Sequence, residues 1–148
     1  MKPELIQKNL QRSILFKDAS QEEIRAFAEA SSVSIVPKGE FVYRKGDDSD
    51  TFYVIALGEA ELYIERSDGT MGSVGRIGPG GHFGETTILT DKPRTLSVRA
   101  LFDLVLICFD SDVFHNLLLA NKKIHQQLDI TLAERLQVAF MGQADVKS

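Results

Sequence analysis

The sequence contains no tryptophan, a single cysteine and no hydrophobic run long enough to cross a membrane. With only Cys108, the chain cannot form an internal disulfide. Cys108 lies in the apolar run 104–109, a context that favours a small core residue over a nucleophile. That run is far shorter than the ~18 apolar residues of a membrane-spanning helix, and no signal-peptide pattern opens the chain. We therefore expect a soluble, cytoplasmic protein.

Positive charge is also scarce. The 148 residues include 17 Lys and Arg against 21 Asp and Glu, which gives a formal net charge of −4. Nucleic-acid binding depends largely on clustered basic residues that neutralise phosphates. The sequence has no such cluster, which argues against a nucleic-acid interface. Its length fits one domain over residues 1–148.

Helical patterns occupy both ends of the chain, and strand patterns occupy its middle. In residues 1–31, Ser20 and Glu23 form a capping box that opens an amphipathic helix ending near Ser31. Residues 32–110 contain short alternating segments separated by turns rich in Gly, Pro and Asp. Many short strands at this spacing predict a mainly β fold, a jelly-roll (β-roll) flanked by N-terminal and C-terminal α-helices.

Two of these segments predict core residues directly. Helical spacing places one apolar face on the first helix, and strict alternation places every second residue of 60–65 toward a core. The expected core residues are Ile24, Phe27 and Ala28 in the helix, and Ala60, Leu62 and Ile64 in the strand.

Residues 111–142 return to helical spacing. Ser111 or Asp112 is expected to cap a first helix, and a longer helix over 122–141 is expected to end at Gly142. The long helix has an apolar stripe and further apolar residues beside it. The stripe comprises Ile124, Leu128, Leu132, Leu136 and Ala139, and the residues beside it are Ile130, Val138 and Phe140.

Residues 80–100 hold the most informative pattern of the sequence. Glycines such as Gly84 let the backbone approach a ligand closely, and the first amides of a short helix bind anions. Arg94, which follows Pro93, can clamp a phosphate with two parallel hydrogen bonds. Glu85 has no place beside a phosphate unless it accepts a hydrogen bond from another group, such as a sugar hydroxyl. The pattern predicts a pocket for a sugar phosphate.

This segment resembles the phosphate-binding cassette of the cyclic-nucleotide-binding domain family. The family includes kinase regulatory subunits, the bacterial catabolite activator and cyclic-nucleotide-gated channels. Its cassette is Phe-Gly-Glu, a short helix, Pro-Arg and a strand ending in Val-x-Ala, and the chain matches it without a gap at 83–85, 93–94 and 98–100. The resemblance extends from the N-terminal helix through the strands to the two C-terminal helices. It implies a single cyclic-nucleotide-binding domain.

The resemblance also implies roles for individual residues. Arg94 is expected to pair with the cyclic phosphate, and Glu85 to accept from the ribose 2′-hydroxyl. Backbone amides of the short helix, and the hydroxyl of Thr87, are expected to surround the phosphate, although Thr87 as a small polar filler stays open. Thr95 is compatible with cyclic GMP and with cyclic AMP, so both ligands stay open. The expected binding residues are Phe83, Gly84, Glu85, Thr86, Thr87, Arg94 and Thr95.

Three positions depart from the commonest family pattern. Thr86 and Thr87 replace an apolar and a small residue, and Leu96 replaces an alanine. In a regular strand, Leu96 shares a face with Arg94. We therefore expect Leu96 to intrude on the pocket or to tighten its floor.

The implied function is that of a non-enzymatic sensor in signal transduction, without a cofactor. The sequence has no nucleophile paired with a base. By resemblance, ligand contact draws the cassette inward and moves the C-terminal helices, with the 122–141 helix as the lever and as a candidate homodimer contact. A helix-turn-helix domain would need tens of residues more, so the expected output is an effector protein that the sequence does not identify.

Two alternatives stay open. The fold could serve as a protein-interaction module that has lost its ligand, because of the departures in the cassette. Alternatively, His82 and Glu85 could begin a cupin-like metal site on a related jelly roll. The metal alternative lacks an evident third ligand, because His115 and His125 fall in the predicted helices.

Overall fold

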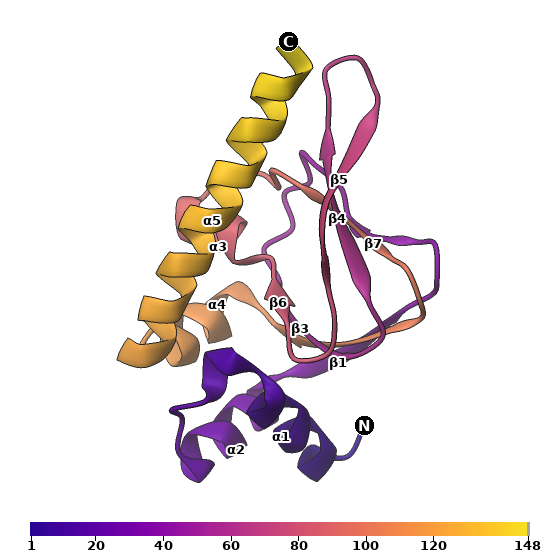
Figure 1. The fold of residues 1–148 in the computed structure, drawn as a ribbon. Coiled ribbons are helices and arrows are strands. Elements are labelled where there is room, and N and C mark those ends of the chain that lie inside the picture. Colours follow the sequence, from indigo (N-terminus) through magenta and orange to yellow (C-terminus); the bar gives the residue numbers. More distant parts are fainter. Residues whose placement is uncertain (148) are drawn as a thin grey trace.

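The computed structural model describes residues 1–147, with side chains of the last helix described up to Arg135 and at Gln137. Its strands form two four-stranded antiparallel sheets (Figure 1). The first sheet has the order β1 (Ser32–Val36), β8 (Leu104–Phe109), β3 (Phe52–Leu57) and β6 (His82–Phe83). The second has the order β2 (Phe41–Tyr43), β7 (Ser97–Ala100), β4 (Ala60–Glu65) and β5 (Met71–Ile77). The predicted mainly β roll is confirmed.

Helices flank the roll at both ends of the chain. The N-terminal group comprises α1 (Pro3–Arg12), the 3₁₀ turn η1 (Ile14–Phe16) and α2 (Gln21–Ala30). The short α3 (Glu85–Thr90) joins β6 to β7, and α4 (Ser111–Val113), the π-helical turn η2 (Phe114–Leu118) and α5 (Lys122–Lys147) follow β8. The sequence alone located only α2 in the first 31 residues, so α1 and η1 are additions from the structure.

Two large apolar cores, among the described residues, hold these layers together. The first lies between the two sheets and contains the alternating residues Ala60 and Leu62 of β4, opposite Leu104 and Leu106 of β8. The second lies between the other face of the first sheet and the helices. It joins Val54 and Ile107 to residues of α1, α2, η2 and α5, including Leu10, Ile24, Phe27, Phe114 and Leu128. The core residues predicted in α2 and β4 are all buried.

Capping side chains fix the starts of two helices and connect them. The Ser20 Oγ accepts from the Glu23 amide at 3.1 Å, and the Ser20 amide donates to Glu23 Oε1 at 2.8 Å, so the predicted capping box is confirmed. Glu23 Oε2 also accepts from the Asn121 side-chain amide at 2.8 Å. The Asn121 Oδ1 in turn accepts from the amides of Lys123 and Ile124 at 3.1 Å. One polar chain therefore joins the start of α2 to the start of α5.

Two predicted helix boundaries are wrong. Asp110, and neither Ser111 nor Asp112, caps α4, because its carboxylate accepts from the Val113 amide at 2.9 Å. The last helix does not end at Gly142 but continues to Lys147. An interior glycine costs a helix only about 0.5–1 kcal/mol relative to alanine, and helix-forming residues continue on both sides of Gly142.

The apolar stripe of α5 is described only in part. Ile124 and Leu128 are buried, Leu132 is half-buried and Ile130 is exposed. The side chains of Leu136, Val138, Ala139 and Phe140 lie outside the described residues. The structure therefore supports one buried face of α5 over its first half.

Cys108 lies in the core between the sheets, as the sequence predicted. Burial raises the pKa of its thiol to about 11, which keeps it protonated at neutral pH. Among residues 1–147, no helix combines the length and the apolar character that crossing a bilayer requires.

Candidate functional site

The candidate site begins at Gly84, the single residue between β6 and α3. Gly84 has φ +96°, a conformation that side chains with a Cβ rarely adopt. A Cβ at this position would lie 2.7 Å from the Thr51 carbonyl oxygen and 3.2 Å from Arg94 Nη1. Glycine is therefore required here both by the backbone angle and by the close approach of Arg94.

Arg94, the arginine of the cassette, is buried against the Gly84 turn, with 3% of its surface exposed. Its Nη1 donates to the Gly84 carbonyl at 2.7 Å, its Nη2 to the Thr51 carbonyl at 2.8 Å and its Nε to the Ser49 hydroxyl at 3.3 Å. Its guanidinium carbon lies 4.0 Å from the centroid of the Tyr43 ring.

All of these partners of Arg94 are neutral. No carboxylate forms an ion pair with Arg94 within the part of the chain that the structure describes. A buried charge is costly unless an opposite charge or many hydrogen bonds compensate it. The arrangement leaves a fixed positive charge that an anion beside the cassette would neutralise.

Glu85, the first residue of α3, is fully buried and paired with Arg135 of α5. Arg135 Nη1 lies 3.0 Å from Oε2 and 3.1 Å from Oε1 of Glu85, and its Nη2 donates to the His82 carbonyl. Burial raises the pKa of Glu85 above its ordinary value, while the positive charge of Arg135 acts in the opposite direction. Arg135 thus links the cassette to the last helix, and α5 runs beside α3 in Figure 1.

An aromatic cluster supports the cassette from the roll. The Phe83 ring stacks on the Tyr53 ring with centroids 5.0 Å apart, and it lies 6.0 Å from the Tyr43 ring. Phe83 is fully buried in the core between the sheets. Phe83 is therefore placed as a packing residue that holds the Gly84 turn.

The three threonines of the predicted site have different surroundings. Thr86 is half-buried, and its carbonyl accepts from the Thr90 hydroxyl at 2.6 Å. Thr87 is 7% exposed, and its Oγ1 is buried without a hydrogen-bond partner among the described residues. Thr95 is half-buried and precedes β7.

The expectation that Leu96 shares a strand face with Arg94 is wrong. β7 begins only at Ser97, so residues 94–96 do not alternate as a strand. Leu96 packs instead with Ile64 and the half-buried Val74, on the β4–β5 side of the roll.

Four residues of the site were not predicted from the sequence, namely Tyr43, Ser49, Thr51 and Arg135. Tyr43 and Arg135 are about 50 and 40 residues from Arg94 along the chain, and only the fold brings them to the cassette. A lone tyrosine in a short strand, or one arginine among the charged residues of a helix, carries no local signal of such a role. Ser49 and Thr51 contribute through the loop before β3.

The histidines weighed as metal ligands are spread over the structure. His82 is buried against Phe52, with ring centroids 5.6 Å apart, whereas His115 and His125 are exposed on η2 and α5. Glu85 is paired with Arg135. In the described part of the chain, no three His, Cys, Asp or Glu side chains are grouped so that they could hold one metal ion.

Comparison with known proteins bears on the same segment. The family model described as the cyclic nucleotide-binding domain matches residues 34–121, more than half of the chain. The chain belongs to this family. Among curated proteins, the cAMP-dependent protein kinase regulatory subunit of Emericella nidulans is 37% identical over 91 residues. Lysophospholipase nte1 of Aspergillus terreus is 30% identical over 102 residues.

The chain matches only a small part of these relatives. It covers 21% of the kinase regulatory subunit and 7% of the lysophospholipase, using 62% and 69% of its own length. What it shares with them is the cyclic-nucleotide-binding regulatory domain.

Solved structures show the same fold. The regulatory domain of Toxoplasma gondii PKA, crystallised with cAMP, aligns with a TM-score of 0.82 at 20% identity over 89% of this chain and 50% of that one. The Thermus thermophilus catabolite activator protein aligns with a TM-score of 0.76 at 25% identity over 86% and 60%. The regulatory subunit of a cAMP-independent protein kinase A from Trypanosoma brucei aligns with 0.80 at 22% over 87% and 46%. The fold is thus shared by proteins that differ in their response to cAMP.

Proposed function

We propose that this domain is a non-enzymatic, cytoplasmic sensor that binds a cyclic nucleotide, cyclic AMP or cyclic GMP, and transmits its occupancy through α5. The observation that carries the proposal is the buried guanidinium of Arg94, which has only neutral partners among the described residues. A cyclic phosphodiester has one negative charge and would supply the missing anion. Arginine can meet such a group with two parallel, charge-assisted hydrogen bonds.

Glu85 supports the second contact. A carboxylate beside a phosphate site would repel the ligand unless it accepts a hydrogen bond from it. The pair with Arg135 offsets the charge of Glu85 and leaves acceptor capacity, because a carboxylate has about four lone-pair sites and Arg135 Nη1 occupies part of them. A ribose 2′-hydroxyl suits the remaining capacity.

Arg135 also suggests how occupancy reaches α5. A ligand that changes the position of Glu85 acts directly on the helix that holds Arg135. Such coupling requires that the ligand bind the two arrangements of α5 with different affinity. An effector protein, or a second copy that packs on α5, would detect the shift. No cofactor is required for this function.

Calorimetric titration of cyclic AMP and of cyclic GMP into the wild type and the Arg94→Ala variant tests the proposal. Removing one partner of a buried charge pair costs about 3–5 kcal/mol, so affinity should fall by about two to four decades. Arg94→Lys keeps the charge but loses the bidentate geometry, and its affinity should lie between the two. Thermal melts show whether each variant is folded.

Arg25→Ala is the matched control, because Arg25 is exposed on α2, away from the cassette. Its affinity should equal that of the wild type. Equal affinity of the wild type and of folded Arg94→Ala would refute the assigned clamp. An absence of heat and of any melting shift in the wild type with both nucleotides would favour the interaction module that has lost its ligand.

A further inference from the structure

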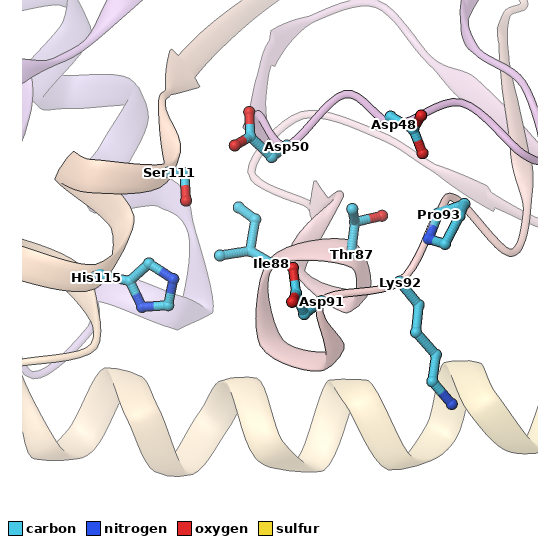
Figure 2. Close-up of a pocket in the computed structure, with 9 residues that line it drawn as sticks. All are labelled: Asp48, Asp50, Thr87, Ile88, Asp91, Lys92, Pro93, Ser111 and His115. Carbon is cyan, nitrogen blue, oxygen red and sulfur yellow. The ribbon is translucent and has the colours of Figure 1, made fainter.

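A cavity lies on the outer side of α3, the cassette helix. It has a volume of about 460 Å³ and is bounded by α3, by the loop between β2 and β3, and by the start of the α4–η2 segment (Figure 2). Neither Arg94 nor Glu85 lines it. Its size lies in the range of small-molecule sites, which is about 300–1,000 Å³. Of the residues expected to bind the nucleotide, Thr87 lines it, so the cavity lies beside the proposed nucleotide site, on the outer face of α3.

The wall of this cavity is acidic. Asp48 and Asp50 of the β2–β3 loop and Asp91 at the end of α3 line it, and none of the three forms an ion pair within residues 1–147. The basic residues that line the cavity are Lys92 and His115. Figure 2 shows the Lys92 side chain extending toward α5, away from Asp48 and Asp50. The cavity thus has three carboxylates that form no ion pair among the described residues.

The Thr87 hydroxyl, which was expected near the phosphate from the sequence, is a second sign of a ligand beside the carboxylates. Thr87 lines the same cavity, is more than nine-tenths buried, and its Oγ1 has no hydrogen-bond partner among the described residues. In Figure 2 this hydroxyl points toward the space between Asp48 and Pro93. A buried hydroxyl without a partner costs free energy, and a hydrogen-bond donor bound in the cavity would remove that cost.

The spacing of the carboxylates favours an extended cation over a metal ion. No three acidic or histidine side chains of the described residues are close enough to share one metal ion. The carboxylates lie around the cavity, on the β2–β3 loop at one side and directly after α3 at the other (Figure 2). An organic cation with separated ammonium groups can meet both sides at once, and each ammonium has three donors for carboxylates and hydroxyls.

We propose that this cavity binds an ammonium-bearing ligand, a free polyamine or a lysine side chain of a partner protein. Asp48, Asp50 and Asp91 hold the ammonium groups, and the hydroxyls of Thr87 and Ser111 complete the hydrogen bonds. The proposal goes beyond cyclic-nucleotide binding and is tested without a nucleotide. A negative result for the amine ligand therefore leaves the proposed nucleotide function untouched, and the reverse is also true.

The test is an NMR titration of the full chain with spermidine, alongside a tri-lysine peptide and Mg²⁺, at an ionic strength of about 0.15 M, where loose surface attraction is screened. We expect saturable shifts centred on the amides of Asp50, Thr87 and Ser111. Tighter binding of spermidine identifies a free polyamine as the ligand, and tighter binding of the peptide identifies a partner's lysine.

The decisive variant is Asp50→Asn with Asp91→Asn. Asparagine tolerates the left-handed backbone that Asp91 adopts at φ 54°, so the fold should be kept. Affinity for the better probe should fall about tenfold or more, since two charge-assisted contacts are lost. Glu22→Gln with Glu29→Gln removes the same charge from exposed positions of α2 and should leave affinity within about twofold.

Three outcomes would overturn the proposal. The first is an absence of saturable shifts with either amine. The second is an equal loss of affinity in the two double variants, which would mean attraction to net charge alone. The third is reproduction of the same shifts by Mg²⁺, which would mean an inorganic cation site.

Discussion

The guanidinium of Arg135 lies against the fully buried carboxylate of Glu85, with Nη1 3.0 Å from Oε2. The two residues are 50 positions apart, one at the start of the cassette helix and the other midway along α5. Arg135 also donates to the His82 carbonyl just before the cassette. A single side chain therefore ties the last helix to the segment that holds the proposed ligand contacts.

Arg135→Gln should destabilise the protein strongly. The change leaves the Glu85 carboxylate buried without its charge partner, a loss of about 3–5 kcal/mol in the free energy of unfolding. Glu85→Gln combined with Arg135→Gln should cost less than the sum of the single changes, because both charges are then removed together. Urea denaturation of the four proteins measures the coupling free energy.

Lys123→Gln, at an exposed position of the same helix, is the matched control and should change stability by less than about 0.5 kcal/mol. Strict additivity of the two single variants would show that the contact between Glu85 and Arg135 contributes nothing to folding.

Tyr43 should contribute to nucleotide affinity through its ring and not through its hydroxyl. The guanidinium carbon of Arg94 lies 4.0 Å from the ring centroid, a cation–π contact worth about 0.5–2 kcal/mol. Tyr43→Phe keeps the ring and should keep nucleotide affinity, whereas Tyr43→Leu should weaken it by about 2- to 30-fold. Calorimetry on both variants checks this, and equal affinity of the Phe and Leu variants would contradict it.

Gly84→Ala should damage the site more than the backbone angle alone requires. The new Cβ would lie 2.7 Å from the Thr51 carbonyl oxygen, in addition to the strain of φ +96°. Gly69 has a similar φ of +89°, and a Cβ there would meet no atom within 4 Å. Gly69→Ala therefore isolates the cost of the angle, about 1 kcal/mol. Thermal unfolding of both variants gives the comparison.

We expect Gly84→Ala to be the less stable of the two and to lose nucleotide affinity, because Arg94 and Thr51 must move. Equal melting temperatures for the two variants would show that the loop before β3 yields without cost.

His82 should make the protein less stable as the pH falls. Burial lowers the pKa of His82 from 6.5 to about 3. Between these two pH values the imidazole is protonated in the unfolded chain and neutral in the folded protein. Stability contributed by neutral His82 is complete above pH 6.5 and is lost as the pH decreases, by about 2 kcal/mol at pH 5. Glu85 acts in the opposite direction, because burial raises its pKa and the folded state holds the proton more tightly.

The contribution of His82 is therefore measured as a difference. His82→Gln removes the titration while Glu85 is unchanged, so the stability of the wild type should fall relative to that of the variant between pH 7 and pH 5. Parallel pH profiles of the two proteins would show that His82 is accessible to protons in the folded state.

Much of the fold followed from local patterns in the sequence. The alternation in β4 and the turn residues between strands predicted a mainly β fold, and the capping box at Ser20 predicted the start of α2, because each signal depends on neighbours within a few residues. The two helix boundaries that were predicted wrongly also have local causes. At α4 two polar residues compete with Asp110 for one cap, and at Gly142 a small propensity cost does not end a helix that continues beyond it.

Part of the candidate site could likewise be predicted from the sequence, and part depends on the tertiary structure. The sequence predicted the cassette residues Phe83 to Glu85, Pro93 and Arg94. They could be predicted because the Gly84 backbone and the Arg94 side chain belong to one continuous segment. The tertiary structure alone decided that Tyr43 lies under Arg94, that Leu96 packs away toward Ile64, and that Arg135 reaches Glu85. These contacts join segments tens of residues apart, so they depend on how the sheets and α5 pack, which no periodicity or turn signal specifies.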